Sequence, residues 1–259
     1  GDRLKQDTYA RHPATSRPWN LILYADEITP QNPLQTGQDR RKIQAIYWSF
    51  KEFGAALLST ETAWFCIACF RSAMVGEIDG GMSAVFRILL ERFFFNVDGH
   101  HLQNAGIQLR DRDNNRYMLV ASLDIVVGDE PALSELILSK GHAGRKPCPC
   151  CVNVYLKKSR LTPGGVYATS TDVDAMVPHT DDSIAEIFRR LRASRVTMAT
   201  TRFKELETTY GFSYNENAIH YATCIPIRTI SWYMSDWMHT YVMSGIFQPR
   251  GSRPHYLVE

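Results

Sequence analysis

Apolar residues in the first third of the chain form three runs that predict β-strands. Residues 19–28 are almost continuously apolar until Asp26-Glu27, which indicates a buried strand that ends in acidic residues. Two further runs, 43–53 and 63–70, are separated by a short segment containing glycine, serine and threonine. That spacing is typical of neighbouring antiparallel strands.

The middle of the chain alternates between helical and strand patterns. Apolar residues recur at helical spacing over 85–95, after a pair of glycines. Residues 107–110 and 117–127 flank an Asp-Asn-Asn sequence that is typical of a hairpin turn, and the second arm contains the longest predicted strand. A helix is predicted next, because Pro131 stands where a first helical turn accepts proline.

The last part of the chain begins with a change of composition. Residues 140–180 are rich in Gly, Pro, Cys, Ser and Thr, which indicates an insertion or a loop subdomain. A helix is predicted from Ser183, because Ser183 and Glu186 have the spacing of a capping box. Further helices are predicted over 201–210, which a glycine follows, and over 235–246.

This order of elements is typical of a ribonuclease-H-like α/β fold, in which a mixed sheet has flanking helices. Here the fold carries a Cys-containing insertion. We therefore divide the chain into an N-terminal arm (1–18), the first part of the core (19–139), the insertion (140–180) and a helical region (181–259).

The composition is that of an ordinary globular protein. Of the 259 residues, 44% are apolar and 22% are charged, which argues against disorder. No apolar run approaches the roughly 18 residues of a membrane span, and the first residues lack the apolar stretch of a signal peptide. We therefore expect an intracellular protein of a reducing compartment, with no membrane partner.

The charge pattern does not identify a partner by itself. The formal net charge is only +2, which excludes a strongly basic nucleic-acid binder. Local basic clusters occur at residues 40–42 and at Arg189, Arg190, Arg192 and Arg195. Taken singly, these clusters are typical of solvated helix faces.

Two aspartates follow apolar strands and are the main candidates for chemistry. Asp26 ends the first predicted strand, and Asp129 follows the longest one. Carboxylates brought to one edge of a sheet can hold divalent metals for phosphodiester chemistry. The alternative is that each aspartate caps a turn or a helix. Asp124 and Glu130 compete with Asp129 for the second position.

A cysteine knuckle, Cys148-Pro149-Cys150-Cys151, is the second candidate site. Six cysteines in a chain of this length do not suggest a disulfide scaffold, and three within four residues favour a metal. Cys148 and Cys151 have the CxxC spacing of a zinc knuckle, which supplies two of four ligands. Asp236 and His239 are the best donors for the rest, since positions i and i+3 share a helix face. Weaker candidates are Cys150, His142 and His179.

The alternative for the knuckle is a reduced turn without metal. A second CxxC sequence, Cys66 to Cys69, lies inside a predicted strand, where positions i and i+3 point to opposite faces. We therefore expect Cys66 and Cys69 to be core residues. The sequence contains no nucleophile elbow and no phosphate-cradling glycine loop.

Together these motifs resemble the transposases of CACTA-type (En/Spm-like) transposons and of the related Plavaka elements. The resemblance covers about residues 19–246 and is carried by the order and spacing of four pieces. The pieces are Ala25-Asp26, Asp129-Glu130-Pro131-Ala132, the stretch from Leu138-Ser139-Lys140-Gly141 through Lys146-Pro147-Cys148-Pro149-Cys150-Cys151, and Asp236-Trp237-Met238-His239 followed by Gly245. The family has Asp-Gly after the first strand, whereas this chain has Asp26-Glu27.

The resemblance implies a ribonuclease-H-like DDE domain that cleaves and joins DNA at transposon ends in the nucleus. Asp26 and Asp129 would be its first two ligands for Mg²⁺ or Mn²⁺, with a structural Zn²⁺ at the knuckle, and a homo-oligomer is possible for such a protein. The family's third acid lies beyond the Asp-x-x-His motif, and the only acid here after His239 is Glu259. We therefore expect a truncated domain or an inactive, repurposed relative.

Two other functional classes stay open from the sequence. One is a non-enzymatic module that binds nucleic acid or protein, with a structural zinc knuckle and with both aspartates as caps. The other is an intact metal nuclease of another family, in which Glu130 or Asp124 completes the site.

Overall fold

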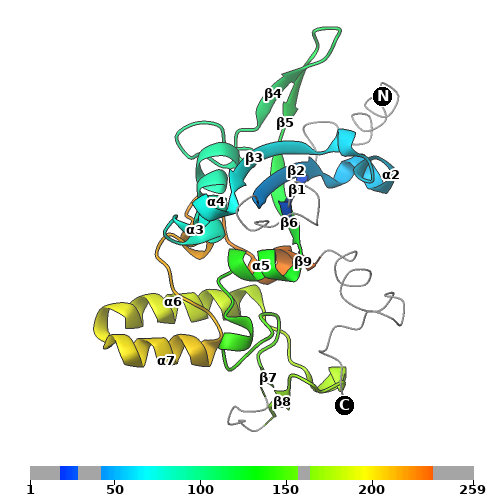
Figure 1. The fold of residues 1–259 in the computed structure, drawn as a ribbon. Helices are drawn as coiled ribbons and strands as arrows, with labels where there is room; N and C mark the ends of the chain where they lie inside the picture. The colour runs from blue at the N-terminus through cyan, green and yellow to red at the C-terminus, as the bar shows by residue number, and fades with distance from the viewer. Residues whose placement is uncertain (1–17, 29–41, 157–163, 236–259) are drawn as a thin grey trace.

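A five-stranded mixed sheet forms the centre of the protein (Figure 1). The computed structural model describes residues 18–28, 42–156 and 164–235. The strands lie in the order β3-β2-β1-β6-β9. Strand β1 is antiparallel to β2 and parallel to β6, and β9 is also parallel to β6. The strands are β1 (Trp19–Ile28), β2 (Ile43–Phe50), β3 (Phe65–Arg71), β6 (Ala121–Gly128) and β9 (Tyr233–Ser235).

Helices and two small sheets surround this sheet. The helices are α2 (Gly54–Leu58), α3 (Ser72–Gly76), α4 (Gly81–Ile88), α5 (Glu130–Leu136), α6 (Asp181–Thr197), α7 (Thr200–Tyr210) and α8 (Thr229–Trp232). Short 3₁₀ turns are η2 (Lys51–Phe53), η3 (Glu61–Ala63), η5 (Gly141–Ala143), η6 (Val173–Ala175) and η7 (Ile219–Tyr221), and α4 continues into a π-helical stretch, η4 (Leu89–Phe94). The small sheets pair β4 (Ile107–Arg110) with β5 (Arg116–Leu119) and β7 (Val154–Tyr155) with β8 (Val166–Tyr167).

One face of the sheet carries the main hydrophobic core. Alternate residues of β1, Leu21 and Leu23, are fully buried, in the same cluster as Phe86 of α4 and Leu133 of α5. The cluster continues to Phe188 of α6, so a single core joins the sheet to the helices beyond it. Burial on this scale is the main source of stability in such a domain.

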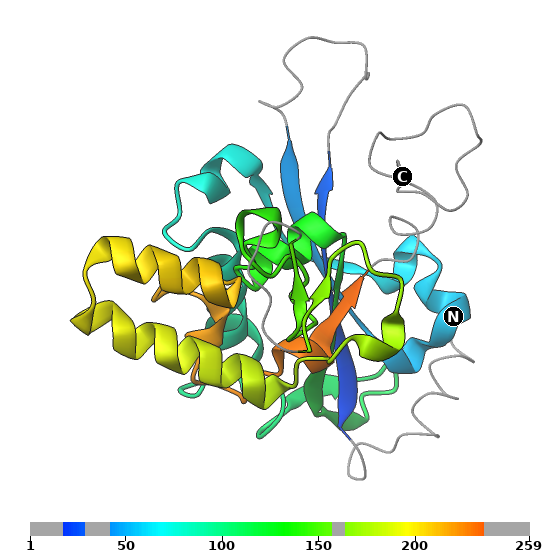
Figure 2. The same ribbon diagram turned by 90° about the horizontal axis from the view of Figure 1, so that it is seen from below.

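The α6–α7 hairpin extends away from the sheet, beyond α5 and on the side where β6 ends (Figures 1 and 2). Thr180 caps α6, and its side chain and that of Ser183 form the capping box. The prediction that Ser183 begins this box was therefore wrong by three residues, because Thr180 satisfies the first free N–H groups. Gly211 ends α7 at φ 82°, and a Cβ there would lie 2.8 Å from the carbonyl oxygen of Lys146.

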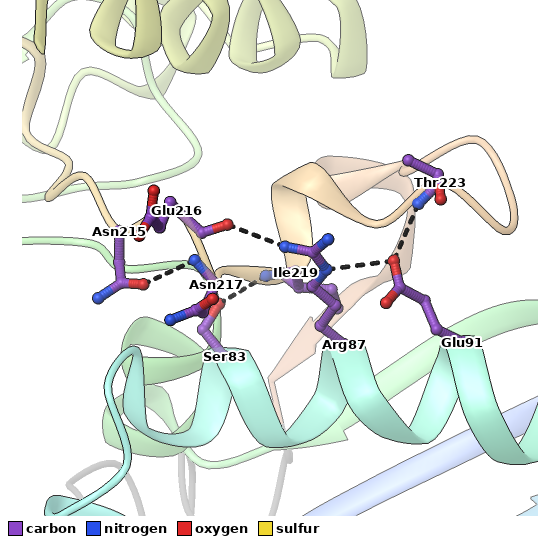
Figure 3. A network of polar contacts seen from close by, with 8 residues as sticks. All are labelled: Ser83, Arg87, Glu91, Asn215, Glu216, Asn217, Ile219 and Thr223. Carbon is purple, nitrogen blue, oxygen red and sulfur yellow. Dashed lines mark hydrogen bonds and ion pairs between the residues drawn. The ribbon is translucent and has the colours of Figure 1, made fainter. Parts of the chain in front are cut away.

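A polar network fastens the segment after α7 onto α4 (Figure 3). The Arg87 guanidinium donates to the Glu216 carbonyl at 2.8 Å and to Glu91 Oε1 at 3.1 Å. The buried Ser83 hydroxyl accepts from Ile219 N at 3.0 Å. These bonds hold the chain that leads to α8 and β9, the last described strand of the sheet.

Two sequence predictions about strands and helices need correction. The run over 117–127 is split at Val120 into β5 and β6, which belong to different sheets. The Val120 carbonyl accepts from Trp19 N at 2.7 Å, so the pairing with β1 starts at this break. Of the helix predicted over 235–246, only Ser235 is described, and it belongs to β9. Within the described ranges, no helix is long and apolar enough to cross a membrane.

Candidate carboxylate edge and cysteine knuckle

Asp26 and Asp129 lie at the same edge of the sheet, on neighbouring strands. Strands β1 and β6 run parallel, and Ala25 pairs with Gly128. The residue after Ala25 is Asp26, still within β1, and the residue after Gly128 is Asp129, directly after β6, so the two aspartates occupy matching positions. Neighbouring strands are separated by roughly 4.8 Å, which brings the two carboxyl-bearing residues within reach of each other. Both side chains are half-buried.

Each aspartate already has one hydrogen-bonding partner. Asp129 is the N-cap of α5, and its Oδ1 accepts from Ala132 N at 2.8 Å. Oδ2 of Asp26 accepts from the Tyr24 hydroxyl at 3.3 Å. The sequence analysis did not single out Tyr24. Its spacing of two residues from Asp26 indicates that both side chains lie on the same face of a strand.

Of the other acids near this edge, Glu27 and Asp124 have structural partners of their own. The Glu27 carboxylate forms an ion pair with Lys42 at 2.8 Å and accepts from Ser72 at 2.9 Å. Asp124 lies within β6, before its end, and pairs with Lys51 at 3.0 Å. Asp124 therefore does not replace Asp129 at the strand end. Glu130, the first residue of α5, is exposed beside Asp129.

The described residues bring two carboxylates together but not a complete metal site. Carboxylate oxygens are the donors that Mg²⁺ and Mn²⁺ prefer, so Asp26 and Asp129 fit such an ion chemically. Among residues 18–28, 42–156 and 164–235, no group of three His, Cys, Asp or Glu side chains could hold a metal ion. The predicted ligands Asp236 and His239, and also Glu259, lie outside the described residues.

The cysteine knuckle forms a compact turn with one activated thiol. Hydrogen bonds from the thiols and backbone N–H groups of Cys150 and Cys151 lower the pKa of Cys148 to about 6, although burial opposes this shift. Burial and the bond to Cys148 raise the pKa of Cys151 to about 11, and the same neighbour raises that of Cys150. The turn therefore favours the thiolate form at Cys148 and the thiol form at Cys150 and Cys151.

The knuckle lies near the sheet edge that carries Asp26 and Asp129, which is called the carboxylate edge below. Burial raises the pKa of Tyr233, in β9, and the neighbouring Cys150, Glu130 and Cys148 raise it further. The Tyr233 side chain therefore lies near both the knuckle and the start of α5. Because β9 pairs with the end of β6, the two candidate sites share one end of the sheet.

The weaker zinc candidates take up different positions. His142 is exposed in η5, whereas His179 is buried. The backbone N–H of His179 donates to the Cys150 carbonyl at 2.8 Å, and its Nδ1 lies 2.7 Å from Ser183 Oγ. Nε2 of His179 is buried with no hydrogen-bond partner, and burial lowers the pKa of this imidazole to about 4. His179 is therefore a neutral side chain beside the knuckle.

The prediction that Cys66 and Cys69 are core residues is wrong, because both are exposed. Strand β3 has a bulge: Ala68 pairs with Ile46 and Cys66 pairs with Tyr47, which leaves Ile67 as an extra residue. The extra residue puts both cysteines on one face of the sheet. Both raise the pKa of Tyr47, as does Asp26, although burial is the larger cause.

We expect Cys148 to react with iodoacetamide at a lower pH than an ordinary thiol. The thiolate is the nucleophile, so the rate for chelator-treated protein should rise with a midpoint near pH 6. Tandem mass spectrometry assigns the label to Cys148. Substituting Cys150→Ala removes the strongest hydrogen bond and should move the midpoint toward the ordinary value of ~8.5. A midpoint above pH 8 in the unsubstituted protein would contradict the described turn.

Comparisons of this chain with protein-family models, with curated proteins and with solved structures found no match.

Proposed function

We propose that this chain is a DNA-processing domain of the DDE-transposase lineage, with a ribonuclease-H-like fold. The observation that carries the proposal is the register of β1 and β6, in which Asp26 and Asp129 follow the paired residues Ala25 and Gly128. Aspartates that only cap a turn or a helix do not have to occupy paired positions on two strands, whereas two aspartates that share a metal do.

The strand arrangement supports the fold part of the proposal. In the sheet, β1 lies between an antiparallel neighbour and a parallel one, and the connections from β3 to β6 and from β6 to β9 both contain helices. This is the arrangement that the resemblance to DDE transposases implies. DNA as the partner and the nucleus as the location belong to the same proposal.

Asp26 and Asp129 would hold Mg²⁺ or Mn²⁺, which supplies activation of the attacking oxygen and stabilisation of the leaving oxygen in phosphodiester cleavage. The protein's own contribution is the rigid placement of the two acids. Asp129 is fixed by its bond to Ala132 N, and the Tyr24 hydroxyl orients the carboxylate of Asp26. Cys148 and Cys151 would hold a structural Zn²⁺ together with Asp236 and His239, and uptake would release the remaining thiol protons.

Incubation with a supercoiled plasmid tests the catalytic part of the proposal. If Asp26 and Asp129 suffice for cleavage without a third acid, the plasmid will be nicked with Mg²⁺ or Mn²⁺ and not in EDTA, read from the conversion to relaxed circles on a gel. A Glu27→Gln variant is the matched control, because Glu27 follows Asp26 on the same strand but pairs with Lys42. Nicking that persists in EDTA, or none with either metal, would contradict metal-dependent cleavage by this chain.

A binding module without catalysis is the second candidate function. Two observations favour it: Asp129 serves as the cap of α5, and the described residues add no third acid to the pair. In that case the carboxylate edge is a remnant of an ancestral nuclease, and the knuckle is structural. Binding of DNA without nicking would support this candidate.

A further inference from the structure

The longest helix of the described chain carries a row of arginines that the proposed metal sites do not use. Between residues 187 and 204 the sequence contains six Lys or Arg and no Asp or Glu. All six side chains are exposed on the α6–α7 hairpin. The complete hairpin (181–210) also contains five acids, so its excess of positive charge is confined to residues 187–204, in a chain whose net charge is only +2.

Three of these arginines form a line along α6. Arg189, Arg192 and Arg195 follow one another at intervals of three residues, which places them on one side of the helix over about 9 Å. Arg189 forms an ion pair with Glu186 at 2.6 Å. In the part of the chain that the structure describes, Arg192 and Arg195 have no ion pair, so their charge is available to an external anion.

Aromatic rings hold these two guanidinium groups in place. Arg192 lies over the ring of Tyr221 at 5.3 Å, and Arg195 lies over the ring of Phe203 at 5.6 Å. A stacked guanidinium keeps its N–H edge free, and that edge matches the oxygens of a phosphate. Prior ordering of the side chains also lowers the entropic cost of binding.

A cavity opens beside this row. Its volume is about 220 Å³, and Arg189, Arg192, Tyr221, His220 and Thr229 contribute to its lining. The Tyr221 hydroxyl donates to the Phe188 carbonyl at 3.0 Å, which fixes the ring under Arg192. Two cationic side chains and the Thr229 hydroxyl at one cavity suit a phosphate group with its ester oxygens.

The hairpin is firmly attached to the end of the sheet that carries the aspartates. Asp181, at the start of α6, accepts from Ile230 N at 2.7 Å and from Ser231 N at 3.1 Å in α8. Helix α8 continues into β9, which pairs with the end of β6 next to Asp129. The start of α6 is therefore tied, through α8 and β9, to the strand that leads to Asp129.

We propose that the Arg189–Arg192–Arg195 face of α6, with its adjoining cavity, binds the phosphate backbone of DNA. A row of exposed cations suits a linear polyanion better than a single small anion, and stacked arginines suit phosphates. This inference rests on the proposed function for the choice of DNA as the polyanion. It adds the surface that holds the DNA while the carboxylate edge faces the strand to be cut.

Binding of a fluorescein-labelled 25-base-pair duplex, measured by anisotropy in EDTA over a series of salt concentrations, tests this proposal. Each phosphate contact contributes about 0.9 to the slope of log K against log salt, so Arg192→Gln/Arg195→Gln should lower the slope by about two. Arg192→Lys/Arg195→Lys keeps both charges and should retain most of the slope. Both variants should melt at the temperature of the unsubstituted protein, because the two side chains are exposed.

The matched control is Arg110→Gln/Arg116→Gln in the β4–β5 hairpin, at the opposite end of the molecule (Figure 1). It removes two exposed charges as well and should leave the slope unchanged. The proposal would be overturned if both double variants lowered the salt slope equally, or if Arg192→Gln/Arg195→Gln left it unchanged. So would loss of binding to phosphatidylserine vesicles with unchanged binding to the duplex. Duplex binding in EDTA, together with no nicking of the plasmid in Mg²⁺ or Mn²⁺, would keep this inference and reject the proposed catalysis.

Discussion

Replacing Leu23 with alanine is expected to lower the free energy of unfolding by about 2 to 5 kcal/mol. Leu23 is fully buried at the centre of β1, where it pairs with Trp48 of β2 and Val126 of β6. Neighbours on both sides are hydrogen-bonded strands, so they cannot move in to fill the cavity that the substitution leaves. Chemical denaturation followed by circular dichroism measures the change.

The matched control for this substitution is Val196→Ala. Val196 lies at the end of α6 and its side chain is 86% exposed, so the expected change is within about 0.5 kcal/mol. If Leu23→Ala were as mild as Val196→Ala, β1 would not be the central strand of the core. The placement of Asp26, three residues farther along the same strand, would then lose its support.

The longer elements were predictable because their local signals agree with their tertiary environment. The first strand was predicted over 19–28 and has these limits in the structure, because both faces of β1 are largely buried and the run is almost continuously apolar as far as Asp26. Helix α7 ends where Gly211 adopts the left-handed conformation that the sequence indicates.

The elements that sequence reasoning missed depend on distant parts of the chain. Strand β9 is three residues long and exists because it pairs with the end of β6. The bulge in β3, which turns Cys66 and Cys69 to one face, appears only in the register against β2. Hydrophobic periodicity carries no information on either feature.

The candidate site shows the same division between local and distant information. The sequence predicts that Asp26 and Asp129 each follow a strand, and the structure adds that the two strands are parallel neighbours in matching register. The cap function of Asp129 was also among the alternatives from the sequence, and the structure contains that hydrogen bond. A substitution that keeps the helix-capping hydrogen bond of residue 129 but removes its carboxylate charge therefore distinguishes the two functions of Asp129 most sharply.

Asp129→Asn makes this separation. Asparagine caps a helix about as well as aspartate, so Asp129→Asn should leave the free energy of unfolding nearly unchanged, whereas Asp129→Ala should lower it by about 1 kcal/mol. Both substitutions remove a carboxylate from the proposed metal site. Divalent-metal affinity should therefore fall in both variants by on the order of tenfold or more, since hard cations depend on charged oxygen ligands.

The most direct test is a calorimetric titration of Mn²⁺ into the unsubstituted protein, Asp26→Asn, Asp129→Asn and the control Glu27→Gln. If Asp26 and Asp129 share a metal, each of their two variants will lose the affinity that Glu27→Gln retains, and Asp129→Asn will do so with unchanged stability. Equal Mn²⁺ affinity in all four proteins would show that the matched aspartates hold no metal, and the account of this edge as a nuclease site would be wrong.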